Sequence, residues 1–172
     1  MVGSYALHKE LHDLPPKREE MVKLLTVDLD LPLGVVAPYR PNHPIIQSIP
    51  PTTLAQSSFD GTLSILVNGG PLQEELSRLA ANENLAILGS SANLTGTGAK
   101  SLIEEIETEV REAADIIIDY GRQKFNSPRS SSTMIDFQNL ELIRYGACYD
   151  VLQDALWRYY RIRFPLQDPI PG

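Results

Sequence analysis

The sequence predicts an α/β domain in which helices pack against a mixed β-sheet. Three observations lead to this prediction: the chain length, short apolar runs that alternate with helical patterns, and turn residues between them. The chain has 172 residues, of which 42% are hydrophobic and 22% charged, as is typical of a globular protein with its own core. We expect a single domain over residues 1–172, with residues 1–30 and 160–172 at its periphery.

Short apolar runs bounded by turn residues predict the strands. The first two cover 31–38 and 63–67, and they are closed by a proline and by Asn-Gly-Gly. The remaining expected strands are 85–89, 115–119, 132–136 and 141–146.

Apolar residues at helical spacing predict three helices. The first follows Gly70, and its apolar stripe consists of Leu72, Leu76, Leu79 and Ala80. A second is expected from Ser101, which can form a capping box with Glu104, to Ala114. Residues 149–160 are expected to form a closing helix.

Charge and composition limit the classes of function. The formal net charge of −7 disfavours a broad surface for nucleic-acid phosphates, so we expect weak or no direct RNA binding. The single cysteine, Cys148, excludes an internal disulfide and a cysteine-based metal site, which makes a reducing compartment the default. No apolar run reaches the roughly 18 residues of a membrane span, and the N-terminal residues lack a signal-peptide core. We therefore expect a cytoplasmic protein without membrane contact.

The segment GSSANLTGTGAK, residues 89–100, concentrates small, hydroxylated and amide side chains after an expected strand. Ligand loops collect at such strand ends in open α/β sheets. Hydroxyl and amide groups both donate and accept hydrogen bonds, and glycines let the backbone approach a ligand. The candidate residues are Ser90, Ser91, Asn93, Thr95 and Lys100. A solvated polar loop is the alternative interpretation.

Two further polar elements stand downstream. In SPRSSSTMID, Arg129 precedes four consecutive hydroxyl residues that run into an expected strand. In LIRYGAC, Arg144 lies between a strand end and a glycine. Arginine offers a planar fork that binds phosphate or carboxylate through two hydrogen bonds. Ser132, Thr133 and Arg144 therefore join the candidate anion-binding residues.

Four motifs in this chain resemble, in their order, those of the YrdC-like threonylcarbamoyl-adenylate synthases. They are SSANLTG (90–96), AADIIIDYG (113–121), SSTMID (131–136) and IRYGA (143–147), and the resemblance covers about half of the chain. The family has a Ser-Ala-Asn-Leu-Ser-Gly motif after a strand, an Ala-Asp strand ending in Asp-Gly, a Ser-Thr strand ending in Asp, and an Arg-x-Gly turn. The resemblance implies a twisted mixed sheet with helices packed against it, around a concave anion-binding cavity.

The same resemblance implies a nucleotidyltransferase. Members join threonine, bicarbonate and ATP into threonylcarbamoyl-adenylate and release pyrophosphate, for the threonylcarbamoyladenosine modification of tRNA. ATP, with Mg²⁺ as its counterion, would be a substrate, and no tightly bound protein-ligated metal is implied. Carried over from the family, Ser91 and Asn93 would contact the phosphates or the carbamoyl group, Ser132 would hydrogen-bond a phosphate, and Arg144 would pair with one.

The front of the chain departs from the family pattern. Its Pro-Thr-Asp-Thr-x-Tyr motif, Lys-x-Arg-Pro segment and Arg-hydrophobic-Pro strand are absent in that form. Lys17, Arg18 and Arg40 are the candidates to replace the missing positive charges. Three functions stay open: a threonylcarbamoyl-adenylate synthase-like enzyme, a repurposed enzyme of this fold acting on another anionic or acyl substrate, and a noncatalytic nucleotide- or RNA-binding module. No catalytic residue is assigned.

Two other features have competing interpretations. His8 and His12 are four residues apart in HKELH, which can place two imidazoles on one helical face for a metal. No third ligand is evident, so a solvated helix end is preferred. The tail LWRYYRIRFP interleaves aromatic residues with arginines, a pattern that can stack on RNA. A closing helix with an aromatic core face, or a homodimer contact, is preferred there.

Overall fold

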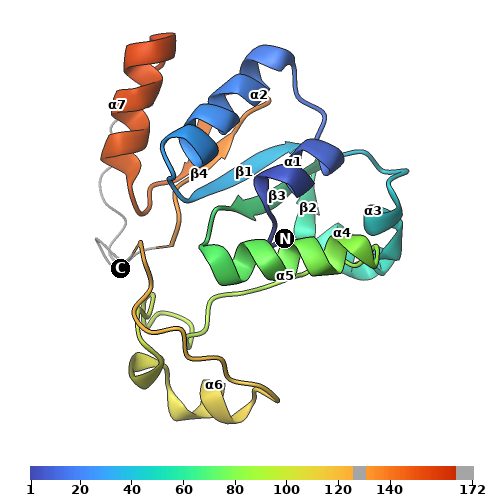
Figure 1. Ribbon diagram of the computed structural model, residues 1–172, viewed down its shortest axis with the longest axis vertical. Coiled ribbons are helices and arrows are strands. Elements are labelled where there is room, and N and C mark those ends of the chain that lie inside the picture. The colour runs from blue at the N-terminus through green and yellow to red at the C-terminus, as the bar shows by residue number, and fades with distance from the viewer. Residues whose placement is uncertain (126–130, 166–172) are drawn as a thin grey trace.

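A mixed five-stranded sheet in the order β2-β3-β1-β4-β5 forms the centre of the molecule (Figure 1). The structure is a computed structural model that describes residues 1–125 and 131–165. The strands are β1 (Leu33–Pro38), β2 (Ser58–Phe59), β3 (Thr62–Val67), β4 (Met134–Asp136) and β5 (Glu141–Arg144). β1 is parallel to β4, and the other neighbouring strands are antiparallel. The expected mixed α/β architecture is confirmed.

Seven α-helices and two further helical turns accompany this sheet within the described residues. The α-helices are α1 (Tyr5–Leu11), α2 (Pro16–Lys23), α3 (Pro44–Ser48), α4 (Pro51–Ser57), α5 (Pro71–Asn82), α6 (Thr108–Glu112) and α7 (Tyr149–Tyr160). The π-helical turn η1 covers Leu24–Asp28 and the 3-10 turn η2 covers Ile103–Glu105. No helix among the described residues is both long and apolar enough to span a membrane.

Side chains alternate between the two faces of the central strands, as extended backbone requires. One face carries the fully buried Leu33, Val35, Leu63 and Ile65, which share a core with residues of α1, α2 and α7. The opposite face is open: its side chains, Val36, Thr62, Ser64 and Leu66, are only partly buried. The sheet therefore has a core face and an open face.

Residues 1–30 are not peripheral, contrary to the sequence-based prediction. This segment supplies Leu7, Leu11, Met21, Val22 and Leu25 to the core, each at most 4% exposed. The helices that carry them are short and rich in charge, so their few apolar residues show no clear helical period. At the other end of the chain, Phe164 is also buried against the core.

The predictions for the middle of the chain are wrong at three places. Residues 85–89 make only a single bridge, between Ile87 and Val2, and 115–119 form no strand. The helix expected over 101–114 is broken into η2 and α6. Apolar spacing shows that a segment favours burial, but a strand also needs a neighbour with which to pair, and the sequence does not supply that neighbour.

Two details of the expected helices are also corrected. The expected capping box between Ser101 and Glu104 does not form: the N-cap of η2 is Leu102, and the main-chain N–H and Oγ of Ser101 donate to Glu105 Oε2 at 2.9 and 3.2 Å. On α5, Leu76 and Leu79 of the apolar stripe are 42% and 48% exposed. That stripe therefore does not face the core along its whole length.

Gly146 lies in the turn between β5 and α7, pressed against the residues that precede β4. A Cβ at this position would lie 2.6 Å from Ser132 C and from Thr133 N. Because backbone atoms cannot rotate away, we expect Gly146→Ala to lower the free energy of unfolding in urea by about 1–3 kcal/mol. Gly89→Ala is the matched control, since its Cβ would meet a Val2 methyl at 3.2 Å. Equal losses in the two variants would contradict this account of the turn.

Candidate functional site

A cavity of about 450 Å³ opens on the open face of the sheet. Its floor consists of Gly34, Ser64, Leu66 and Met134. It lies where β1 and β4 begin and β3 ends, so it is not at the carboxyl ends of the parallel strands. The loop over 89–100 and the residues just before β4 form its walls.

The structure brings six of the candidate residues together around this cavity: Ser90, Ser91, Asn93, Lys100, Ser132 and Arg144. They come from three separate motifs, SSANLTG with its following lysine, SSTMID and IRYGA. Arg129, from the second polar element, lies outside the described residues. The convergence assembles hydroxyl, amide and cationic groups at one place.

Five other candidates do not line the cavity. Thr95 is an exposed loop residue, and Lys17 and Arg18 lie on α2. Thr133 is fully buried, and its Oγ1 donates to the Ala147 carbonyl at 3.0 Å. Arg40, the fifth, contacts the C-terminal end of α1. The expectation that these five residues face an anion is therefore wrong for this cavity.

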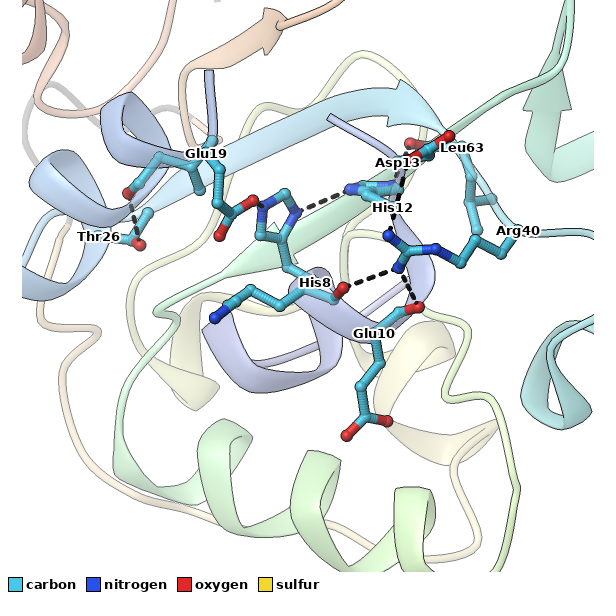
Figure 2. Close-up of polar contacts among 10 residues, drawn as sticks. His8, Glu10, His12, Asp13, Glu19, Thr26, Arg40 and Leu63 are labelled. Carbon is cyan, nitrogen blue, oxygen red and sulfur yellow. Dashed lines mark hydrogen bonds and ion pairs between the residues drawn. The ribbon is translucent and has the colours of Figure 1, made fainter. Parts of the chain in front are cut away.

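Arg40 instead caps the C-terminal end of α1 (Figure 2). Its Nη1 donates to the carbonyl oxygens of Lys9 and Glu10 at 2.8 and 2.6 Å, and its Nη2 lies 3.6 Å from Asp13 Oδ1. A cation at this end satisfies unpaired carbonyls and complements the helix dipole. Arg40 therefore does not replace a family arginine in the cavity.

Arg144 is the cation that dominates the cavity. Its Nε and Nη2 both donate to the Ser132 carbonyl, at 3.0 and 2.8 Å, which fixes the guanidinium plane against the residues before β4. Burial lowers the pKa of Arg144, yet an arginine starts from so high a value that it stays charged. Its bonding partner is a neutral carbonyl, so no carboxylate in these contacts offsets its positive charge.

Lys100 contributes less positive charge than its position suggests. Its Nζ lies 2.9 Å from Glu107 Oε1 and 3.3 Å from the Thr97 carbonyl. The hydrogen bond from Lys100, with a further one from Thr97, lowers the pKa of Glu107 to about 2, so this carboxylate stays ionised and offsets the lysine. Among the described side chains that line the cavity, Lys100 and Arg144 are the only cations, and none is acidic. The N-terminal amine of Met1 also lies there; it donates to the Ser64 carbonyl at 2.7 Å, and burial lowers its pKa.

Several lining residues were missed from the sequence, among them Ser64, Ser131 and Gln123. Ser64 could have been found, because it is the polar residue at an alternate position of the apolar strand LSILV. Gln123 gave no such signal. It reaches the cavity because its main-chain N–H donates to the Ser101 carbonyl at 2.9 Å, a contact between segments far apart in the chain.

A second cavity, of about 630 Å³, lies on the same face and shares Ser64 with the first. Its lining includes Asp60, Asp136 and Glu141, so it disfavours anions. Asp136 has a structural role there: its Oδ1 accepts from the Gln138 N–H at 2.7 Å and its Oδ2 from Asn139 Nδ2 at 2.9 Å. The described lining of the first cavity has no acidic side chain, so by charge it suits an anion better than the second cavity does.

The arginine-rich tail is used within the molecule. Arg161 and Arg163 lie over the Trp157 ring, with Cζ 5.3 and 4.1 Å from its centroid. The buried face of α7 consists of Tyr149, Leu152, Ala155 and Leu156, whereas Tyr159 is exposed. The expected aromatic core face is therefore mostly aliphatic.

Neither a scan of protein-family models nor a search of curated protein sequences gives a match to this chain. The resemblance to the YrdC-like synthases therefore rests on the four motifs alone. Within the described residues, no group of three or more His, Cys, Asp or Glu side chains is arranged to hold a metal ion. The lining of the cavity combines hydroxyl and amide side chains with the guanidinium of Arg144.

Proposed function

We propose that this protein binds nucleotide phosphates in the first cavity and acts as a nucleotidyltransferase that joins ATP, threonine and bicarbonate into threonylcarbamoyl-adenylate. One observation carries the proposal: Ser91 and Asn93, Ser132, and Arg144 come from three distant motifs and line the same cavity. Random polar loops have no reason to converge in this way. The family resemblance gives the convergence its chemical interpretation.

Adenylyl transfer suits such a site because its catalysis depends mainly on positioning and charge. Threonine and bicarbonate form a carbamate with loss of water, and a carboxylate oxygen of this carbamate attacks the α-phosphorus of ATP. The bond between the α-phosphorus and the oxygen that bridges it to the β-phosphate breaks, and pyrophosphate leaves. Donors aimed at the phosphate oxygens stabilise the charge that develops. Arg144 would supply the fixed positive charge, and the hydroxyls of Ser91 and Ser132 would donate to phosphate oxygens. Any Mg²⁺ would enter with the nucleotide.

A second candidate function is favoured by the charge of the cavity. ATP carries several negative charges, but Arg144 is the one lining cationic side chain whose described contacts include no carboxylate. Each missing charge-assisted contact costs about 1.5–3 kcal/mol. Two such losses slow a reaction on the order of a hundredfold or more. A repurposed enzyme for a smaller anionic or acyl substrate, or a noncatalytic binding module, would need fewer cations.

Pyrophosphate release from ATP tests the proposal. We expect slow release that requires both threonine and bicarbonate, together with Mg²⁺. Binding of ATP without any such release would favour the second candidate. If neither ATP nor inorganic phosphate binds, the proposed nucleotidyltransferase and every phosphate-binding alternative fail.

A further inference from the structure

His8 on α1 and His12, which directly follows this helix, are buried, not solvated as the sequence suggested. His8 is 0% and His12 2% exposed. Figure 2 shows their rings linked, with His8 Nδ1 2.8 Å from His12 Nδ1. His8 Nε2 lies 2.9 Å from Glu19 Oε2 on α2, and His12 Nε2 lies 3.0 Å from the Leu63 carbonyl on β3. These contacts form one continuous chain of hydrogen bonds from the sheet, through α1, to α2.

The partners determine where the hydrogens lie. His12 Nε2 faces a carbonyl, which only accepts, so this nitrogen carries a hydrogen. Burial, reinforced by the neighbouring His8, lowers the pKa of His12 to about 3, so the ring is neutral and its Nδ1 accepts. His8 Nδ1 must then donate to it. His8 Nε2 faces Glu19 Oε2, and the pKa of Glu19 is held below its ordinary value, so this carboxylate is the acceptor at that end of the network.

Glu19 holds its charge through its contacts. Burial alone would raise the pKa of Glu19, but hydrogen bonds from His8 and Tyr5 and the nearby positive charges keep it below its ordinary value. Burial, and the same carboxylate, raise the pKa of Tyr5. The other charged groups that act on the network are Lys9 of α1, Asp28 of η1 and the N-terminal amine.

The contact between His8 and His12 has no acceptor for one more hydrogen. A proton added to His12 could bind only at Nδ1, where it would face the N–H of His8 at 2.8 Å. A charged ring would then lie inside the core, and the only carboxylate among the described groups that act on His12 is already in contact with His8. Protonation of His12 therefore breaks this contact and favours separation of α1 from its neighbours.

α1 is directly connected to the wall of the first cavity. Only Ser4 stands between the helix and Gly3, whose N–H donates to the Leu66 carbonyl at 2.9 Å. Val2 lines the cavity, and its N–H donates to the Ile87 carbonyl at 2.9 Å. A displacement of α1 therefore pulls on the residues that close this side of the cavity.

We propose that His8, His12 and Glu19 form an acid-sensitive latch, which holds α1 against the sheet at neutral pH and releases it, together with the adjoining cavity wall, on acidification. The latch does not depend on which ligand the cavity takes. The contribution of His12 to the latch is complete above the ordinary pKa of this residue, 6.5, and decreases as the pH falls towards 3, because the released state binds the extra proton. Protonation of Glu19 adds to the loss at the acidic end.

Amide hydrogen exchange, corrected for intrinsic rates, tests the latch in the full chain. Between pH 7 and pH 5, we expect the opening constant of the α1 amides to rise on the order of tenfold. The amides of Val2, Gly3 and Leu66 should lose protection with them, whereas those of α7 should not. Equal changes in α1 and α7 would mean global destabilisation and would overturn the proposal.

Two matched variants isolate the titrating ring. His12→Asn keeps an acceptor for His8 but cannot be protonated, so the pH-dependent rise should largely disappear. His43→Asn changes the one histidine outside the network, which lies in a 3.9 Å contact with Glu10 and caps α3, and it should leave the rise intact. If His12→Asn does not fold, the NMR signals of the His12 ring in the wild-type protein, followed as a function of pH, test the latch instead. A His12 ring that is neutral at pH 5 supports the latch, and one that titrates near 6.5 overturns it.

Discussion

Replacing Arg144 with methionine is expected to weaken ATP binding by roughly tenfold to a hundredfold, because a charge-assisted contact contributes about 1.5–3 kcal/mol. Arg144 is the lining cation whose described contacts do not include a carboxylate, whereas Lys100 is paired with Glu107. Isothermal calorimetry with Mg²⁺ and ATP measures the effect. Loss of the guanidinium also removes two hydrogen bonds to Ser132, so circular dichroism must show that the fold persists.

Two further variants separate charge from geometry. Arg144→Lys keeps the charge but not the fork, and we expect an intermediate affinity. Arg78→Met removes the same charge from the exposed surface of α5, where Arg78 pairs with Glu75 at 2.6 Å. That control should bind ATP like the wild type. If Arg78→Met and Arg144→Met lose equal affinity, the effect comes from net charge rather than from a site.

Phe137→Ala is expected to lower the free energy of unfolding by about 3–5 kcal/mol, the largest stability effect that we predict. Phe137 follows β4 directly, is fully buried, and has its main-chain N–H bonded to the Val36 carbonyl at 2.9 Å. Truncating it leaves a cavity in the core beside the central strands. Urea denaturation, monitored by circular dichroism, measures this change in the free energy of unfolding.

The same substitution at Phe59 is the control, because that ring is 84% exposed on the edge strand β2. Phe59→Ala removes little buried surface, and its effect should stay within about 0.5 kcal/mol. A Phe137→Ala loss as small as that of Phe59→Ala would show that the core does not extend to the end of β4.

The parts of the fold that the sequence predicted are those whose signal is local. Short apolar runs closed by turn residues predicted β1 and β3, and helical spacing predicted α7 with the bounds 149–160 that the structure has. Such a run becomes a strand only where a neighbouring strand is available, and the sequence does not show where that is. Residues 115–119 read as a strand, but Ile116 is 79% exposed and the segment pairs with no strand.

In the candidate site, too, local motifs could be predicted from the sequence, whereas contacts between distant residues could not. Family motifs pointed to Ser91, Asn93, Ser132 and Arg144, and the fold places all four around one cavity. Charge compensation could not be predicted, because it depends on contacts across loops, as between Lys100 and Glu107. The burial of His8 was missed for a similar reason: its partner Glu19 lies on another helix, and a seven-residue helix shows too little periodicity.

An NMR titration of the ¹⁵N-labelled protein with Mg²⁺ and ATP tests most directly whether the first cavity is a nucleotide site. The account predicts saturable shifts of main-chain amides in the loop over 89–100, at Ser131 and Ser132, and at Arg144. Amides near the acidic second cavity, such as Asp60 and Glu141, should not shift. Shifts confined to that second cavity, or no saturable shifts at millimolar ATP, would contradict the account.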